Sequence, residues 1–290
     1  GALYIYQAKM IIAGHWHKLT ACGLSFISIY PFLISGIHVF LNDYILSAQV
    51  VSMIFSSATL VPLYLLCRRF FDTHIAALAT LIAVMNPEMC SRSGNVVRDP
   101  VYWFFLAMGI YLTVRYWDHR SGYRNLTMAS IAFIIAVWAR IDAIFPLVLT
   151  AACLPFLGKK GLLKRLSAYG APILALCLAI LIFVMIYHIP VNRFLRLDFI
   201  LMKLFTVISA YQQVASGIDN LSNNQIPLII QFFLPEVKNH IWLIALGTML
   251  NRTLETFFYP FIPFFLIGIF SIKHAVQKDA RWRYLILSIG

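Results

Sequence analysis

Two short stretches place arginine close to aspartate at the edge of an apolar run. Arg98 and Asp99 stand just before one such run, and Arg140 and Asp142 follow another. Only 11 of the 290 residues are acidic, so an acid in this position calls for an explanation. A guanidinium group beside an apolar segment pairs with a carboxylate or a phosphate. Together with Arg92, these residues predict a site that binds an anionic headgroup such as a phosphate.

Asp99 has a structural and a functional interpretation. Aspartate is a preferred N-cap and proline favours the first turn of a helix, and such a cap contributes about 1 kcal/mol. On the functional interpretation, Asp99 stands at a membrane boundary, where ionisable side chains are costly and often functional. The two are compatible. We expect Asp99 to cap a helix that starts at Pro100 and to face a cavity lined by Arg98 and Arg140.

Arg140 and Asp142 are two positions apart, and residues at i and i+2 do not share a helix face. A salt bridge between them within one helix is therefore not expected. If the chain turns here, Asp142 is explained as a cap. Arg140 still needs a carboxylate or phosphate partner.

The composition assigns these residues to a membrane protein. Hydrophobic residues make up 61% of the chain and charged residues 12%, whereas a soluble domain has about 45–50% and about 25%. We expect an all-α, polytopic membrane protein. The net charge of +12 comes from short basic clusters rather than a continuous stripe. It therefore indicates cytoplasmic loops and contact with membrane lipids, and not a nucleic-acid partner.

Four basic clusters between apolar runs give a topology, because lysine and arginine mark cytoplasmic loops. The clusters are Arg68 and Arg69; Arg115, Arg120 and Arg124; Lys159, Lys160, Lys164 and Arg165; and Lys273, Lys278, Arg281 and Arg283. Each interval between clusters becomes a helical hairpin with its tip outside. The expected helices are residues 45–67, 73–86, 101–114, 126–138, 143–157, 167–187 and 253–272. Several are shorter than the roughly 20 residues that a standard bilayer needs.

The long outer loop carries further charges. Arg193, Arg196, Asp198 and Lys203 alternate with apolar residues, which is typical of a helix that lies in the membrane interface. Surface anchoring is the simpler explanation of this pattern. Residues 226–234 and 241–250 are apolar enough to form a further pair of short helices, or to lie flat in the interface.

The sequence gives no positive support for ATP hydrolysis, dinucleotide chemistry or serine hydrolysis. It contains no Walker motif, no GxGxxG, no GxSxG and no HExxH. The five cysteines show no spacing typical of a zinc site.

Five segments resemble the GT-C glycosyltransferases, which include the protein O-mannosyltransferases and the lipid A aminoarabinose transferases. The segments are GALYIYQAKMIIAG (residues 1–14), SIYP (28–31), LYLLCRRFF (63–71), VRDPVYWFFLAMGIYL (97–112) and ARIDA (139–143). The first resembles the first outer loop of these enzymes, and the fourth resembles the second outer loop with the helix after it. The resemblance covers about residues 1–160.

The resemblance implies a membrane enzyme that moves a sugar from a polyprenyl-phosphate carrier to a protein, lipid or glycan acceptor. The reaction is expected at the outer or periplasmic face of the inner membrane. Asp99 corresponds to the second-loop carboxylate and is the expected catalytic residue. The donor phosphate is expected to contact Arg98, Arg140 and Arg92. Loop or acceptor contacts are expected from Tyr4, Asp142, Arg193 and Arg196.

The resemblance also implies the layout of one glycosyltransferase domain with GT-C-like transmembrane helices and outer loops that carry short interfacial helices. Residues 1–44 form the first outer loop, 45–187 the transmembrane hairpins, 188–252 the long outer loop, and 253–290 a C-terminal part cut short in this fragment. Residues 24–41 then stay outside. The first-loop carboxylate falls just before Gly1, and Ile29 stands where some members have an acid. No metal site is assigned, and a divalent metal is an open alternative.

A flippase for lipid-linked oligosaccharides, or another membrane transporter, is the alternative function. Transporters usually carry their polar residues near the bilayer midplane, on broken helices related by repeats. Here the charges are expected to gather at one face. The sugar, the acceptor and the oligomeric state are left open by the sequence.

Overall fold

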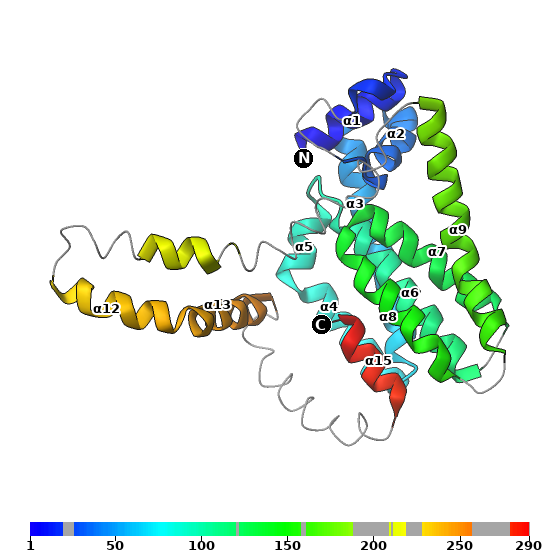
Figure 1. Cartoon of the computed structure of the whole chain (residues 1–290). Helices are drawn as coiled ribbons and strands as arrows, with labels where there is room; N and C mark the ends of the chain where they lie inside the picture. Colours follow the sequence, from blue (N-terminus) through cyan, green and yellow to red (C-terminus); the bar gives the residue numbers. More distant parts are fainter. Residues whose placement is uncertain are drawn as a thin grey trace. The chain divides into compact units, whose positions relative to one another are not determined.

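The structure, a computed structural model, describes residues 1–19, 26–119, 122–157, 161–187, 209, 211–218, 228–256 and 279–289. Every regular element among them is a helix (Figure 1), which confirms the all-α prediction. Contacts divide the chain into two units, Gly1–Leu195 with Gly268–Gly290, and Arg196–Ile267.

Three helices of the first unit closely follow the apolar runs that predicted them. In chain order the described helices of this unit are α1 (Ala2–Ile12), the 3-10 helix η1 (Trp16–Lys18), α2 (Ile29–Leu41), α3 (Tyr44–Cys67), α4 (Thr73–Met85), α5 (Pro87–Ser93), α6 (Asp99–His119), α7 (Arg124–Ala139), η2 (Ile141–Ala143), α8 (Ile144–Cys153), η3 (Leu154–Leu157), α9 (Leu162–Tyr187) and α15 (Ala280–Ile289). The bounds of α3, α4 and α7 lie within two residues of the predicted ones.

Four segments differ from the prediction. With 21 and 26 residues, α6 and α9 are longer than the apolar runs that predicted them, because both helices continue into their polar ends. The helix expected at residues 143–157 is divided into η2, α8 and η3. Pro155 lacks the N–H that would continue α8, so the chain tightens into a 3-10 turn there. The short helix α5 was not predicted; Asn86 caps it and Pro87 opens it.

In the second unit, residues 211–218 are helical, and α12 (Leu228–Asn239) and α13 (Ile241–Thr256) follow. The last two are the pair of short helices that the apolar runs at 226–234 and 241–250 allowed. Most of the helix expected at 253–272 lies outside the described residues. So do four charged residues of the long loop: Arg193, Arg196, Asp198 and Lys203.

The packing of α6 against α7 forms the centre of the first unit. Its buried core contains Ile110, Tyr111 and Val114 of α6 and Leu126, Ala129 and Phe133 of α7. Gly109 allows the two helices to approach closely, because a Cβ atom at this position would lie 2.6 Å from the ring of Phe133.

The helices α3 and α6 run in the same direction, as contacts at both ends show. Near their starts, Ser52 Oγ donates a hydrogen bond to the carbonyl oxygen of Val97 over 3.1 Å. Near their ends, Arg69 Nη1 lies 3.6 Å from Asp118 Oδ2. We call these the Asp99 end and the Asp118 end of the first unit. At the Asp99 end, α1 and α2 pack on α3 (Figure 1).

At the Asp118 end, a buried carboxylate lies between arginines from distant segments. Arg281 at the start of α15 forms an ion pair with Asp118, which Arg69 also approaches. Trp282 packs on Phe70 with ring centroids 4.5 Å apart. Two of the basic clusters that the sequence assigned to one membrane face therefore meet at one end of the unit. Which face that is stays a prediction.

The helix α9 contains a proline, and side chains of α7 donate hydrogen bonds to two of its backbone carbonyl groups. Pro172 has no N–H, so the carbonyl of Ala168 lacks its usual partner within the helix. Thr127 Oγ1 of α7 donates a hydrogen bond to this carbonyl over 3.0 Å. One residue on, Ser130 Oγ donates to the carbonyl of Tyr169 over 2.7 Å. Side chains of α7 thus satisfy backbone groups of α9.

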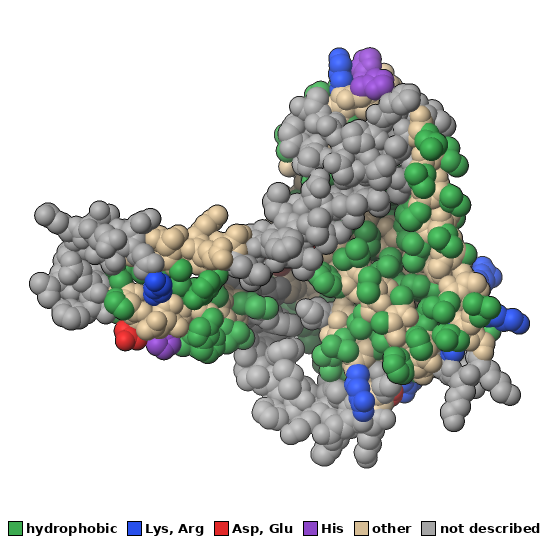
Figure 2. Space-filling model, viewed as in Figure 1, with side chains coloured by type: hydrophobic (Ala, Val, Ile, Leu, Met, Phe, Trp, Pro, Cys, Tyr) green, Lys and Arg blue, Asp and Glu red, His purple; other side chains and the backbone are tan. Residues whose placement is uncertain are grey.

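Two of the described helices are long and apolar enough to cross a membrane, Tyr44–Cys67 and the Leu162–Ala179 part of α9. Many large apolar side chains of α9 are exposed, among them Leu163, Leu174, Leu178, Ile182 and Met185. Figure 2 shows apolar side chains along this helix. An exposed apolar face of this extent fits contact with lipid. The number of crossings stays a prediction.

Replacing Gly109 by alanine should destabilise the first unit by about 1–3 kcal/mol, because the added methyl group overlaps the fully buried Phe133. Thermal unfolding in detergent micelles measures the effect. Gly36→Ala in α2 is the matched control, since nothing lies within 4 Å of its Cβ position. The control should keep or slightly raise the unfolding temperature. Equal unfolding temperatures for both variants would contradict the proposed close contact.

Candidate functional site

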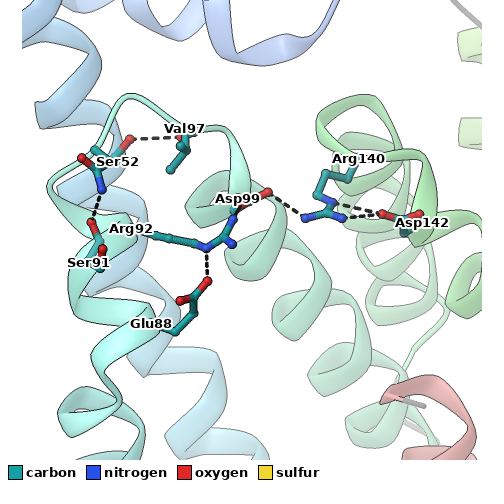
Figure 3. Close-up of polar contacts among 9 residues, drawn as sticks. Ser52, Glu88, Ser91, Arg92, Val97, Asp99, Arg140 and Asp142 are labelled. Carbon is teal, nitrogen blue, oxygen red and sulfur yellow. Dashed lines mark hydrogen bonds and ion pairs between the residues drawn. The ribbon is translucent and has the colours of Figure 1, made fainter. Parts of the chain in front are cut away.

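The carboxylate of Asp99 is held between two arginines. Arg140 Nη1 donates a hydrogen bond to Asp99 Oδ1 over 2.9 Å, and Arg92 Nη1 pairs with Oδ2 (Figure 3). The Asp99 side chain is only 9% exposed. A carboxylate with so little access to water needs such partners.

The helix start differs slightly from the prediction. Instead of starting at Pro100, α6 starts at Asp99 itself, and the carbonyl of Arg98 accepts a hydrogen bond from the backbone N–H of Tyr102. Asp99 is therefore the first residue of the helix and not its cap, and both carboxylate oxygens accept from guanidinium groups. Its negative charge still lies at the helix N-terminus, where it is favourable.

Arg140 and Asp142 pair directly, although not within one helix. Arg140 follows the end of α7 in an extended conformation, and Asp142 lies in η2. Because the chain turns here, Arg140 Nε and Nη2 reach Asp142 Oδ2 at 3.0 and 2.8 Å. No side-chain cap is present at η2 or α8, so the interpretation of Asp142 as a cap was wrong.

Glu88 extends the cluster into α5. Its Oε1 accepts a hydrogen bond from Arg92 Nε, one helical turn away. The order Glu88, Arg92, Asp99, Arg140, Asp142 therefore alternates acid and base across three segments (Figure 3). We call these five residues the charged row.

Both arginines of the charged row are firmly protonated. The hydrogen bond to Glu88 is the main cause that raises the pKa of Arg92 above its ordinary value. Burial alone would lower the pKa of Arg140, but the hydrogen bonds and charges of Asp142 and Asp99 outweigh this and raise it. The arginines thus present fixed positive charge at the Asp99 end.

Arg98 lies beside the charged row but is bound differently. Its guanidinium group lies over the ring of Phe26, 5.0 Å from the centroid. Gln7, which is fully buried, donates from Nε2 to the carbonyl of Phe26 over 3.0 Å and so holds this residue. Arg98 Nη1 is buried and has no hydrogen-bond partner among the described residues.

Apart from Arg98, the predicted site residues fall into three groups. Asp99, Arg92, Arg140 and Asp142 come together in the charged row. Tyr4 is not part of it and packs edge-on against Tyr30 with ring centroids 5.5 Å apart. Arg193 and Arg196 lie outside the described residues.

Several residues of the site were not predicted from the sequence. Glu88 stands four positions before Arg92, a spacing that could have indicated the ion pair. The ring of Tyr102 lies 5.4 Å from the guanidinium carbon of Arg140, and Phe26 lies under Arg98. Neither contact has a local signal in the sequence. Within the described residues, no group of three His, Cys, Asp or Glu side chains is placed to hold a metal ion.

Comparison with known protein families places part of the chain in a described family. Residues 28–189 match the family described as dolichyl-phosphate-mannose-protein mannosyltransferase. This range covers more than half of the 290 residues and includes the whole charged row and Arg98. No curated protein and no solved structure matches the chain.

Asp99→Asn should lower the free energy of unfolding by about 1–3 kcal/mol, because it leaves Arg92 and Arg140 without a shared counter-charge. Glu88→Gln is the matched control, since it makes the same chemical change at the other partner of Arg92. Its carboxylate is 49% exposed, so the control should change stability by less than about 1 kcal/mol. Chemical unfolding in detergent measures both. A loss for Glu88→Gln as large as that for Asp99→Asn would contradict the central place of Asp99.

Proposed function

The chain belongs to the dolichyl-phosphate-mannose-protein mannosyltransferase family, and from this premise we propose that it transfers a sugar from a polyprenyl-phosphate carrier to an acceptor. The proposed reaction takes place at the outer or periplasmic face of a membrane. The family description names a mannosyl donor and a protein acceptor, and we propose the same two classes for this chain.

The observation that carries the proposal is the arginine-rich Asp99 end within the matched range. Asp99 and Asp142 fix the guanidinium groups of Arg92 and Arg140. An arginine has five N–H donors, so each of the two retains donors beyond its carboxylate bonds. Arg98 adds a buried donor that has no partner within the described part of the chain. Such an arrangement suits a phosphate group, which arginine binds through paired hydrogen bonds.

The proposed chemistry has a simple balance. The acceptor hydroxyl oxygen attacks the anomeric carbon of the sugar and forms the new bond. The bond between that carbon and the phosphate oxygen breaks, and its electron pair leaves with the polyprenyl phosphate. The arginines stabilise this developing negative charge. The proton of the hydroxyl passes to a base, which the resemblance assigns to a first-loop carboxylate.

We assign Asp99 a positioning role rather than that of the base. Both of its oxygens accept hydrogen bonds from arginines, which makes them poor acceptors for a further proton. What Asp99 does in this proposal is keep Arg92 and Arg140 close together although their charges repel each other. Tyr4, Arg193 and Arg196 stay candidates for acceptor contacts.

The proposed membrane orientation rests on charge. Arg69, Arg281 and other residues of the basic clusters lie toward the Asp118 end, which the positive-inside rule assigns to the cytoplasm. The Asp99 end then faces outward. With 21 residues at about 1.5 Å each, α6 spans about 30 Å between the two ends, which is the thickness of a hydrocarbon core.

The position of the charges favours the enzyme over the alternative, a transporter. Transporter sites lie near the bilayer midplane. In the described part of α6, the two acidic residues are Asp99 and Asp118, at opposite ends of the helix, and the segment between them is largely apolar.

Sugar transfer is tested with the protein in membranes, radiolabelled polyprenyl-phosphate mannose and an acceptor peptide that contains serine and threonine. We expect label in the peptide and release of polyprenyl phosphate. If the protein instead moves the intact carrier lipid across the bilayer without releasing phosphate, the transporter is the correct function.

Arg98→Gln should raise the KM for the polyprenyl-phosphate sugar about 10- to 100-fold, the effect of losing one charge-assisted hydrogen bond of about 1.5–3 kcal/mol. Steady-state kinetics with varied donor measure this change. The control is Arg124→Gln, which removes an exposed cation at the start of α7, near the Asp118 end. It should leave the KM unchanged. A KM that rises equally in both variants would indicate a general effect of charge and no phosphate contact by Arg98.

A further inference from the structure

Ser52 makes a hydrogen bond that differs from those of Thr59, Thr113 and Thr150. Serine and threonine inside a helix commonly donate to the carbonyl four residues earlier. Thr59, Thr113 and Thr150 do so, to Phe55, Gly109 and Pro146. Ser52 Oγ instead donates across to the carbonyl of Val97, 45 positions later in the sequence (Figure 3).

The reason for this difference is Tyr30. Its hydroxyl lies 2.9 Å from the carbonyl oxygen of Ala48, the atom that Ser52 would otherwise bond, and 2.9 Å from Ser52 Oγ. Each hydroxyl has one proton. Tyr30 can donate its one proton either to the carbonyl of Ala48 or to Ser52 Oγ, and in both cases the proton of Ser52 can go to Val97. Tyr30 and Ser52 are both fully buried, so water does not compete for these bonds.

The carbonyl of Val97 belongs to the short connection between α5 and α6. Arg98 follows it directly, and Asp99 is the next residue. Whatever fixes this carbonyl therefore fixes where the Asp99 carboxylate stands relative to Arg92 on α5 and Arg140 after α7. Errors of about 1 Å in such positions can lower a rate about 100-fold.

The same contact reaches the beginning of the chain. Tyr30 lies at the start of α2, and its ring packs edge-on against Tyr4 of α1. The helices α1, α2 and α3 are thus connected to the segment that carries Arg98 and Asp99 by one buried pair of hydroxyl groups.

We propose that Tyr30 and Ser52 are positioning residues of the sugar-transfer site, which hold the Val97 carbonyl and through it Arg98 and Asp99. This inference rests on the proposed function. Neither residue touches the substrate in this proposal. Their effect is on the rate at which a correctly bound donor reacts.

The test compares Ser52→Ala with Ser56→Ala. Ser56 lies one turn later on the same helix, is also buried, and its hydroxyl has no hydrogen-bond partner among the described residues. The two variants thus lose the same atom, from a bonded and from an unbonded position. We expect Ser52→Ala to lower kcat about tenfold per folded molecule, with little change in the KM for the donor, and Ser56→Ala to keep the kcat of the unchanged protein.

Two further measurements separate positioning from stability. Hydrogen exchange of the backbone amides at residues 94–98 should be faster in Ser52→Ala than in Ser56→Ala. In the double variant of Ser52→Ala and Tyr30→Phe, kcat should fall no further than in the more affected single variant, because both changes break one chain of hydrogen bonds.

The outcomes distinguish the two proposals. If the unchanged protein transfers no sugar, the proposed function is overturned and the positioning role with it. If it does transfer sugar and Ser52→Ala has the kcat of Ser56→Ala, the function stands and the positioning role is overturned. Effects that multiply in the double variant would also overturn it.

Discussion

The structure around α6 depends on keeping a carboxylate charged where little water reaches it. Asp99 is nearly buried, and an unpaired charge in such surroundings costs several kcal/mol. Arg92 and Arg140, which come from separate segments, offset this cost by pairing with Asp99. Arg92 is placed by the short helix α5, and Arg140 is placed by the extended conformation in which the chain leaves α7. The path of the backbone on both sides of α6 is therefore tied to one acidic side chain.

The same solution is used at the other end of the helix. Asp118 is also nearly buried and also lies between two arginines, one after α3 and one on α15. Between the two acids the packing is apolar and close, with Gly109 against Phe133. Ion pairs thus hold both ends of α6 to other segments, and close packing against α7 holds its middle.

What the sequence predicted and what it missed have separate physical causes. Apolar runs predicted α3, α4 and α7 well, because a helix in lipid must satisfy its own backbone and its length follows from hydropathy. Arg92, Asp99 and Arg140 were identified because ionisable side chains are rare in such a chain. The pairing of Arg140 with Asp142 was not predicted, since it needs the turn between them. The contacts of Ser52 with Val97 and of Arg98 with Phe26 join residues far apart in the sequence, and no local pattern reports them.

The hydrogen bonds that α7 donates to carbonyl groups of α9 have a consequence for the stability of α9 in a bilayer. A helix with Pro172 enters lipid with the carbonyl of Ala168 unsatisfied unless a neighbour supplies a donor. Thr127 is that donor, and it lies earlier in the chain, so α7 is synthesised before α9 needs it. If α9 crosses the membrane, its stability there is therefore expected to depend on α7, which supplies this donor.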